Sequence, residues 1–401
     1  MTAKQDNSSV GTDGTAAGRL DKALAELARS REDDPSKRKQ RAKSTVNLIA
    51  NFGAAGDFEA ARRLHDALAD VAANHADEPV LREWRAEATA SLIGHYSEAN
   101  KYSVARGLYN SLAELAVAHP SEPLLRERQA ESVVALIGAY FVTDDFDAAG
   151  RLYDGLGKLA ESHPGEPALR KAQAESAFNI INGYLWDGDP GAAGRFYSSL
   201  RELTDNHPNE PALRELQAKS TVNLIGIFAR DENFDLAGQL YSALGQLAVK
   251  HPGEPLLREF LGRGLLNLII ANLQARDLDA ACGFHDALGQ LTSHHPDEPV
   301  LRELWARTTF NLIIGCCEVG GMSAARQYYD ALAELADNHA GESALRDIRV
   351  KGLAGLVVSY RNSGDQETVA DLFKSTGDLE LERAAYSLIE TFKSDGGNSQ
   401  G

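Results

Sequence analysis

The chain has 401 residues, with 41 Lys and Arg against 58 Asp and Glu, and its formal net charge is -17. Nucleic acids and anionic membranes are bound through clustered cations, so this balance argues against both as partners. Three cysteines exclude a secreted disulfide framework and predict a reducing compartment, the cytoplasm. The sequence has no run of about 18 apolar residues and no hydrophobic N-terminal segment, so we expect neither a membrane span nor a secretion signal.

The N-terminal part is predicted to hold a tail and one unpaired helix. Residues 1–15 are polar and rich in Gly and Ser, and we expect them to be disordered. Residues 17–31 have the pattern of a single helix that precedes the first complete helix pair.

A 44-residue repeat follows. His recurs at 75, 119, 163, 207, 251, 295 and 339, and Arg recurs at 38, 82, 126, 170, 214, 258, 302 and 346. No insertion interrupts this period, so we expect one continuous array over 16–393, with units starting near 36, 80, 124, 168, 212, 256, 300 and 344.

Each period contains two amphipathic segments, for example 123–141 and 146–162. Their apolar residues follow the three-and-four spacing of a helix face, and the polar break at 143–145 suits a tight turn. The pattern therefore predicts an all-α chain of helix pairs.

The junction between periods carries the strongest repeated signals. Pro recurs where the first helix of each pair begins, an acid precedes it, and Arg follows the acid by four residues, as in Glu122 and Arg126. This spacing places acid and Arg on neighbouring turns of one helix. His at the end of the preceding helix suits a C-terminus. We interpret the junction as structural.

The C-terminal end departs from the period. The last unit has Ser343 in place of Pro and shortens after Phe373, and a final helix is predicted over 379–392. We expect residues 394–401 to be a disordered tail.

The segment Leu136-Ile137-Gly138-Ala139-Tyr140, followed by Ala149 and Tyr153, resembles the tetratricopeptide repeat. The match recurs at Tyr184, Ala193 and Tyr197 and at Phe228, Ala237 and Tyr241, although the family's standard unit has about 34 residues. The resemblance covers 36 to about 375 and implies that first helices line a concave groove. The predicted fold is a right-handed α-solenoid of about eight antiparallel helix pairs with terminal capping helices.

A polar face on the first helices is the candidate binding site. One position is charged in all eight copies and changes from mainly acidic to basic along the chain: Lys43, Glu87, Glu131, Glu175, Lys219, Arg263, Arg307 and Lys351. One turn later five copies carry Asn: Asn47, Asn179, Asn223, Asn267 and Asn311. Small residues follow at Ala50, Gly94, Gly138 and Gly226. Together they would let a peptide backbone approach and bond to the amides. Alternatively, Asn bridges adjacent helices and the charges solvate a face.

No enzymatic motif is present, so we expect neither an enzyme nor a cofactor or metal site. Phosphate-binding glycine loops, HExxH and nucleophile elbows are all absent from the sequence. Cys282, Cys316 and Cys317 lack metal-ligand spacing and fit packing positions. The aromatic column from His65 to Phe373 is interpreted as core, whereas Trp84 and Trp305 would be exposed binding anchors or packed side chains.

Three functions remain as hypotheses. The first is a cytoplasmic, non-enzymatic scaffold or adaptor that binds a protein segment or helix in the groove. The alternative is a self-assembling structural protein, since the copies are nearly interchangeable. RNA binding would need a basic inner face, for which only Lys219, Arg263, Arg307 and Lys351 are available.

Overall fold

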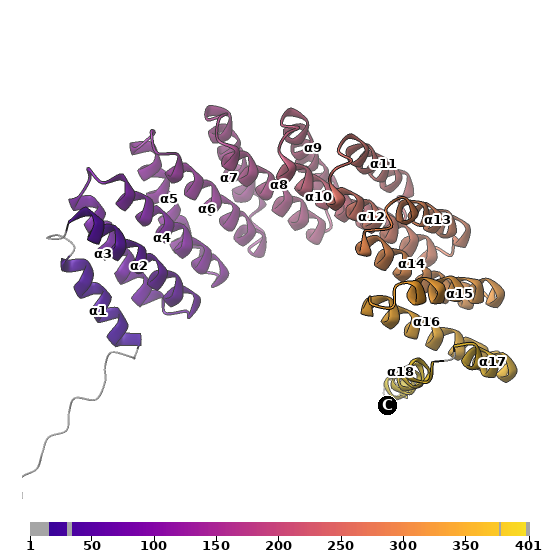
Figure 1. The fold of residues 1–401 in the computed structure, drawn as a ribbon. Coiled ribbons are helices and arrows are strands. Elements are labelled where there is room, and N and C mark those ends of the chain that lie inside the picture. Colours follow the sequence, from indigo (N-terminus) through magenta and orange to yellow (C-terminus); the bar gives the residue numbers. More distant parts are fainter. Residues whose placement is uncertain (1–15, 30–33, 377, 398–401) are drawn as a thin grey trace, which may run out of the picture. The chain divides into compact units, whose positions relative to one another are not determined.

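The computed structural model describes residues 16–29, 34–376 and 378–397, which form eighteen α-helices and no strand (Figure 1). Eight helix pairs account for sixteen of them, which confirms the predicted α-solenoid. The first helices of the pairs are α2 (Pro35–Ala54), α4 (Pro79–Glu98), α6 (Pro123–Val142), α8 (Pro167–Asp187), α10 (Pro211–Arg230), α12 (Pro255–Gln274), α14 (Pro299–Glu318) and α16 (Ser343–Asn362). The second helices are α3 (Phe58–Asn74), α5 (Tyr102–Ala118), α7 (Phe146–Ser162), α9 (Pro190–Asn206), α11 (Phe234–Lys250), α13 (Leu278–His294), α15 (Met322–Asn338) and α17 (Gln366–Thr376).

Two single helices complete the list, α1 (Ala16–Arg29) and α18 (Leu379–Gly397). Helix α1 packs on α2 and α3, and α18 packs on α16 and α17. The predicted final helix is therefore present, but it continues to Gly397, past the expected start of the tail at 394. The predicted tail at 1–15 lies outside the described residues.

The chain divides into two compact units, each larger than a single repeat, with the boundary inside α10. We call them unit 1, residues 1–216, and unit 2, residues 217–401. Each unit is a stack of helix pairs. The sequence prediction of one continuous array from 16 to 393 therefore stays a prediction.

The turn inside each pair has the same backbone in all eight copies. One residue per turn has a positive φ of 55–82°, namely Gly56, Asn100, Asp144, Gly188, Glu232, Arg276, Gly320 and Gly364. Helix starts then follow from side-chain caps, since Asp57, Asp145, Asp189, Asn233 and Asp277 each accept a hydrogen bond from the backbone N–H three residues on. The polar breaks of the sequence are thus helix caps as well as turns.

The two rows of helices pack differently. Within the units, consecutive first helices contact one another, as in α4 with α6 and α12 with α14. A second helix contacts its own first helix and the next one, as α13 does with α12 and α14, but the backbones of consecutive second helices, such as α13 and α15, do not meet in the described residues. First helices therefore form the closer row, and the concave groove that the resemblance implies for them stays a prediction.

Apolar side chains between the rows form the core. Leu81, Leu125, Leu169, Leu213, Leu257, Leu301 and Leu345 occupy equivalent positions and are at most 1% exposed. The aromatic column is also packed, from His65 at 6% to Phe373 at 8%, with Tyr109 and Tyr241 half-buried. Among the described residues, no helix has the length and apolar character that crossing a membrane requires.

Candidate functional site

The repeated Arg and Glu at the junctions join successive 44-residue repeats. In Arg126 the Nε atom lies 3.1 Å from both carboxylate oxygens of Glu166, forty residues on, and Nη2 donates to Oε1. Nη1 donates to the carbonyl oxygen of Pro120 at 2.5 Å. Although Glu122 is four residues before Arg126, the guanidinium bonds to Glu166, the acid of the next repeat.

We call this contact between successive 44-residue repeats the inter-unit bridge. It is present six times inside the two compact units. Its Nε–Oε1 distances are 2.8–3.1 Å, and its pairs are Arg38–Glu78, Arg82–Glu122, Arg126–Glu166, Arg170–Glu210, Arg258–Glu298 and Arg302–Glu342. Arg346, at the end of the series, instead pairs with Glu380 at the surface. The junction is thus structural, as expected, and it acts between units rather than within one helix.

The repeated His residues complete the same junction. Each ends a second helix as its C-cap, and the Nδ1 atoms of His119, His163, His207 and His339 lie 3.8–4.0 Å from the bridging Glu three residues on. The backbone N–H of that Glu donates to the His carbonyl oxygen, at 3.1 Å for Glu122 and His119. The His column therefore shapes the turn that presents Glu to the preceding Arg.

The predicted Asn positions lie on the accessible side of the first helices. Asn47 and Asn223 are exposed, and Asn179, Asn267 and Asn311 are half-buried. Asn267 donates from Nδ2 to the carbonyl oxygen of Val222 on the neighbouring first helix at 3.1 Å. A Cβ on Gly226 would come within 3.0 Å of that amide nitrogen. At this copy Asn bridges two helices, which is the structural alternative.

Other copies leave the same positions open. Asn47, Asn179 and Asn311 have no hydrogen-bond partner among the described residues. A Cβ on Gly94 or Gly138 would meet no atom within 4 Å. A neighbouring helix therefore does not explain glycine at these two positions.

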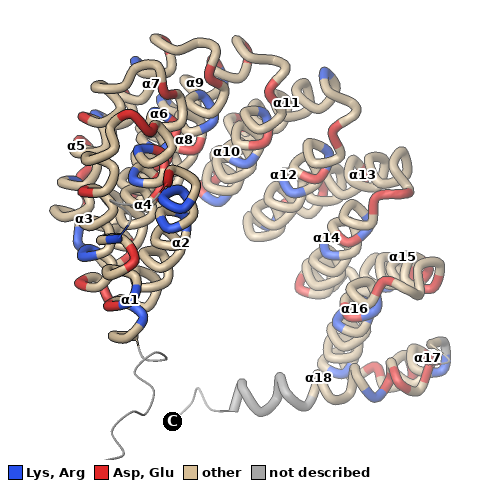
Figure 2. Tube along the Cα trace, turned by 60° about the vertical axis from the view of Figure 1, so that its left-hand side comes forward, with Lys and Arg blue, Asp and Glu red and all other residues tan. Residues whose placement is uncertain are grey.

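The charged positions are largely neutralised by neighbours, so the predicted acidic-to-basic gradient is locally offset. Arg128 lies 2.6 Å from Glu87 and 2.5 Å from Glu131, and Lys171 lies 3.4 Å from Glu175. Arg263 and Arg307 pair with Glu259 and Glu303 at 2.7 and 2.9 Å. Figure 2 shows the two signs side by side on α12 and α14. Lys351 has no ion-pair partner among the described residues. Lys219 adds a further cation of this column on α10.

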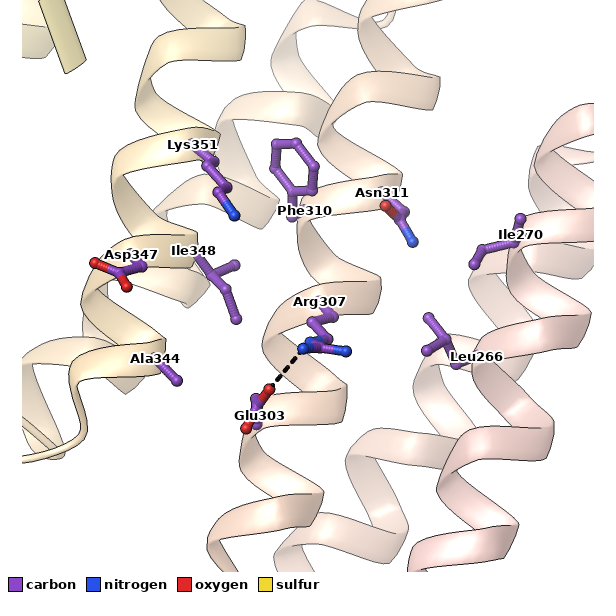
Figure 3. Close-up of a pocket in the computed structure, with 10 residues that line it drawn as sticks. All are labelled: Leu266, Ile270, Glu303, Arg307, Phe310, Asn311, Ala344, Asp347, Ile348 and Lys351. Carbon is purple, nitrogen blue, oxygen red and sulfur yellow. Dashed lines mark ion pairs between the residues drawn. The ribbon is translucent and has the colours of Figure 1, made fainter. Parts of the chain in front are cut away.

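Three predicted residues line one hollow on the first helices of unit 2. Arg307, Asn311 and Lys351 surround a volume of about 390 Å³ between α12, α14 and α16 (Figure 3). Its apolar lining comes from Leu266, Ile270, Phe310 and Ile348, and Glu303 and Asp347 add carboxylates. Amide, cations and apolar side chains thus meet in one concave place, which we call the first-helix hollow.

The exposed tryptophan is not one of the two that the sequence interpretation singled out. Trp84 and Trp305 are half-buried, whereas Trp186 at the end of α8 is 95% exposed. Val142 holds the equivalent position at the end of α6 and is 70% exposed. Glu98 and Arg230 at equivalent positions already signal solvent there, and this comparison would have found Trp186 from sequence.

The cysteines and buried histidines occupy packing positions. Burial raises the pKa of the Cys316 thiol to about 11, and Cys282 Sγ accepts a hydrogen bond from the Tyr328 hydroxyl at 3.1 Å. Burial lowers the pKa of His285 to about 4, and its Nδ1 lies 2.9 Å from the Thr308 hydroxyl. Burial therefore favours the uncharged form of each of these two groups at neutral pH.

Comparisons with known proteins add little. No family model matches the sequence, and the search of curated proteins gives no match. Among solved structures, the chain is similar to the crystal structure of BtubC (BKLC) from P. vanneervenii, with 17% sequence identity and a TM-score of 0.39. That similarity covers 61% of this chain and 91% of the other.

Proposed function

We propose that the chain is a cytoplasmic, tetratricopeptide-like scaffold or adaptor without enzymatic activity, which binds a segment or helix of another protein on its first helices. The first-helix hollow supports this proposal most directly. An apolar side chain of the partner packs against Phe310 and Ile348, and Asn311 bonds to its backbone. Lys351, whose amine is unpaired among the described residues, contributes a contact to a carboxylate.

The site residues of this proposal are the open members of the predicted set. Asn47, Asn179 and Asn311 remain candidate contacts, whereas Asn267 has a structural bond to Val222. The charge column contributes local pairs rather than a long-range gradient. Nucleic acid fits this face poorly, because Arg263 and Arg307 are each offset by a glutamate on the same helix.

The test is affinity purification from native lysate, with bound proteins identified by mass spectrometry. The bait variant combines Asn311→Ala with Lys351→Glu, and the matched control is Lys158→Glu, an exposed cation on the second helix α7. A protein retained by wild type and the control but lost from the hollow variant supports the proposal. Equal retention by all three baits contradicts it.

Self-assembly is the second candidate, and the exposed Trp186 and Val142 favour it. They lie near the C-terminal ends of α6 and α8, two helices that pack against each other in unit 1, so two exposed apolar side chains lie at that end of the neighbouring helices. Light scattering over a concentration series tests it. A constant mass of 43.3 kDa contradicts self-assembly, and concentration-dependent growth that Trp186→Ser abolishes supports it.

A further inference from the structure

A second hollow lies on the opposite row of helices, between α13 and α15. The backbones of these two second helices do not meet, and a space of about 420 Å³ remains between them. Its walls include Gly289, Trp305, Ala331, Glu334, Leu335 and Asn338. None of these residues belongs to the first-helix hollow, so the two spaces are separate.

Trp305 gives this hollow an indole, and no other repeat has an aromatic residue at the equivalent position. The equivalent residues are Arg41, Arg85, Gln129, Gln173, Gln217, Leu261 and Arg349. The indole stacks on His285 with ring centroids 5.1 Å apart and planes 29° apart. Gly289 makes room for it, because a Cβ there would lie 3.2 Å from the indole nitrogen. The ring is thus fixed in place by His285 while Trp305 remains half-exposed at the hollow.

One charge in the hollow is unmatched. The guanidinium of Arg302 is held by Glu342 and the carbonyl oxygen of Pro296, and His339 Nδ1 lies 3.8 Å from the same Glu342. Glu334 is exposed and has no ion-pair partner among the described residues. The hollow therefore combines a fixed indole, an unpaired carboxylate and the amide of Asn338.

We propose that this hollow binds an arginine side chain of a partner polypeptide. A guanidinium is planar, stacks on an aromatic face and donates two parallel N–H groups to one carboxylate. Lysine offers a compact charge without the planar surface and fits the indole less well. The net charge of -17 favours approach of a cationic partner.

Unit 1 contains an equivalent hollow that serves as an internal control. It lies between α7 and α9, has about 510 Å³ and is lined by Gln173 where the other has Trp305. Glu202 is equivalent to Glu334, and Lys158 adds a positive charge to the wall. Without an indole, and with this cation, the unit 1 hollow is expected not to bind arginine.

The experiment follows the indole N–H signals of the full chain, labelled with ¹⁵N-tryptophan, during titration with the peptide acetyl-Gly-Arg-Gly-amide. The chain has three tryptophans, and Trp305→Leu, which copies Leu261, identifies the signal of interest. We expect that signal alone to shift, with a dissociation constant on the order of 1 mM. Glu334→Gln, which copies Gln290, should weaken binding about fivefold or more. Glu202→Gln should leave it unchanged.

Two further peptides decide what is recognised. Citrulline in place of arginine keeps the planar shape and removes the charge, and we expect it to produce no saturable shift. Lysine is expected to bind more weakly than arginine. Equal binding of citrulline or lysine, an unaffected Glu334→Gln variant, or no saturable shift with arginine each overturns the proposal. Circular dichroism spectra and melting curves of the variants verify that each is folded.

Discussion

The junctions between units and the open faces of the helices differ in how they vary along the chain. Each junction within the units has the same Arg, Glu and His in nearly the same geometry, from Arg38–Glu78 to Arg302–Glu342. The faces change from copy to copy, as Trp305 and its equivalent Gln173 illustrate. Repetition therefore marks the residues that hold the stack together, and departures from it mark places where units can recognise different partners.

The largest expected effect comes from removing one inter-unit bridge. Arg126→Met leaves Glu166 without its partner at a junction where the two side chains are 8% and 21% exposed. The partial exposure of Glu166 places the expected loss near the lower end for a broken buried pair, roughly 3 kcal/mol. Urea denaturation measures it.

Arg346→Met is the matched control, because Arg346 is 53% exposed and pairs at the surface. We expect little change in stability there, because water screens an exposed ion pair. Equal loss of stability in the two variants would contradict the view that the bridge at a junction stabilises the fold more than an ion pair at the surface.

A smaller loss of stability is expected at low pH, where His285 becomes protonated in the unfolded chain. The folded-state pKa is about 4 and the ordinary value is 6.5. Between these values the unfolded chain binds more protons, so stability is full above pH 6.5 and falls as the pH decreases toward 4. Each pH unit contributes about 1.4 kcal/mol, so roughly 2 kcal/mol is lost by pH 5.

Denaturation at pH 7 and pH 5 measures that loss, with His285→Tyr as the comparison because Tyr153, Tyr197, Tyr241 and Tyr329 occupy equivalent positions. The variant should lose less stability between the two pH values. The same pH dependence in both proteins would assign the acid sensitivity to other groups.

The open first-helix face gives an effect of opposite sign. Gly138→Ala adds a methyl group where no atom lies within 4 Å, and it should stabilise the helix by about 0.5–1 kcal/mol. Under the proposed function the same methyl group weakens partner binding, because the glycine allows close approach. Melting curves and the affinity purification measure the two effects.

Gly107→Ala on α5 is the control, since Gly107 is equally open but lies on a second helix. It should raise stability and leave binding unchanged. Loss of binding in both variants would show that weaker binding is not specific to substitutions on the first helices.

The smallest effect is expected in the turn inside a pair, where the backbone is constant and the side chain varies. Arg276 has a φ of 61°, and Arg276→Gly relieves that strain, stabilising by about 0.5 kcal/mol. Gly188→Ala, at a φ of 82°, should destabilise. Calorimetric melting temperatures that move in the same direction for both would contradict this account.

The sequence was sufficient for the architecture because period, helix faces and caps are local signals. Proline positions and polar breaks placed the helix starts, as Pro123 and Asp145 show. Which Glu pairs with the bridging Arg could not be predicted from local signals. Arg126 has one Glu four residues back and another forty residues on, and only the packing of successive units selects the second.

The candidate site was less predictable for the same reason. Whether Asn267 reaches Val222 depends on the spacing between two helices, which no single period encodes. The pairing of Arg307 with Glu303 could be foreseen from their four-residue separation. The first-helix hollow, by contrast, exists only when α12, α14 and α16 are packed together, because its lining comes from all three helices.

The inter-unit bridge also gives the chain a rule for growth. Each period carries one Arg that donates to the Glu of the following period and one Glu that accepts from the Arg of the preceding period. Arg126 thus donates to Glu166, and Glu122 accepts from Arg82. Deleting residues 124–167 would remove Arg126 and Glu166 together and leave Glu122 forty residues after Arg82, with Arg170 then four residues after Glu122. Whole-period duplication or loss therefore leaves no unmatched charge, and the number of units can change during evolution without redesign of the junction.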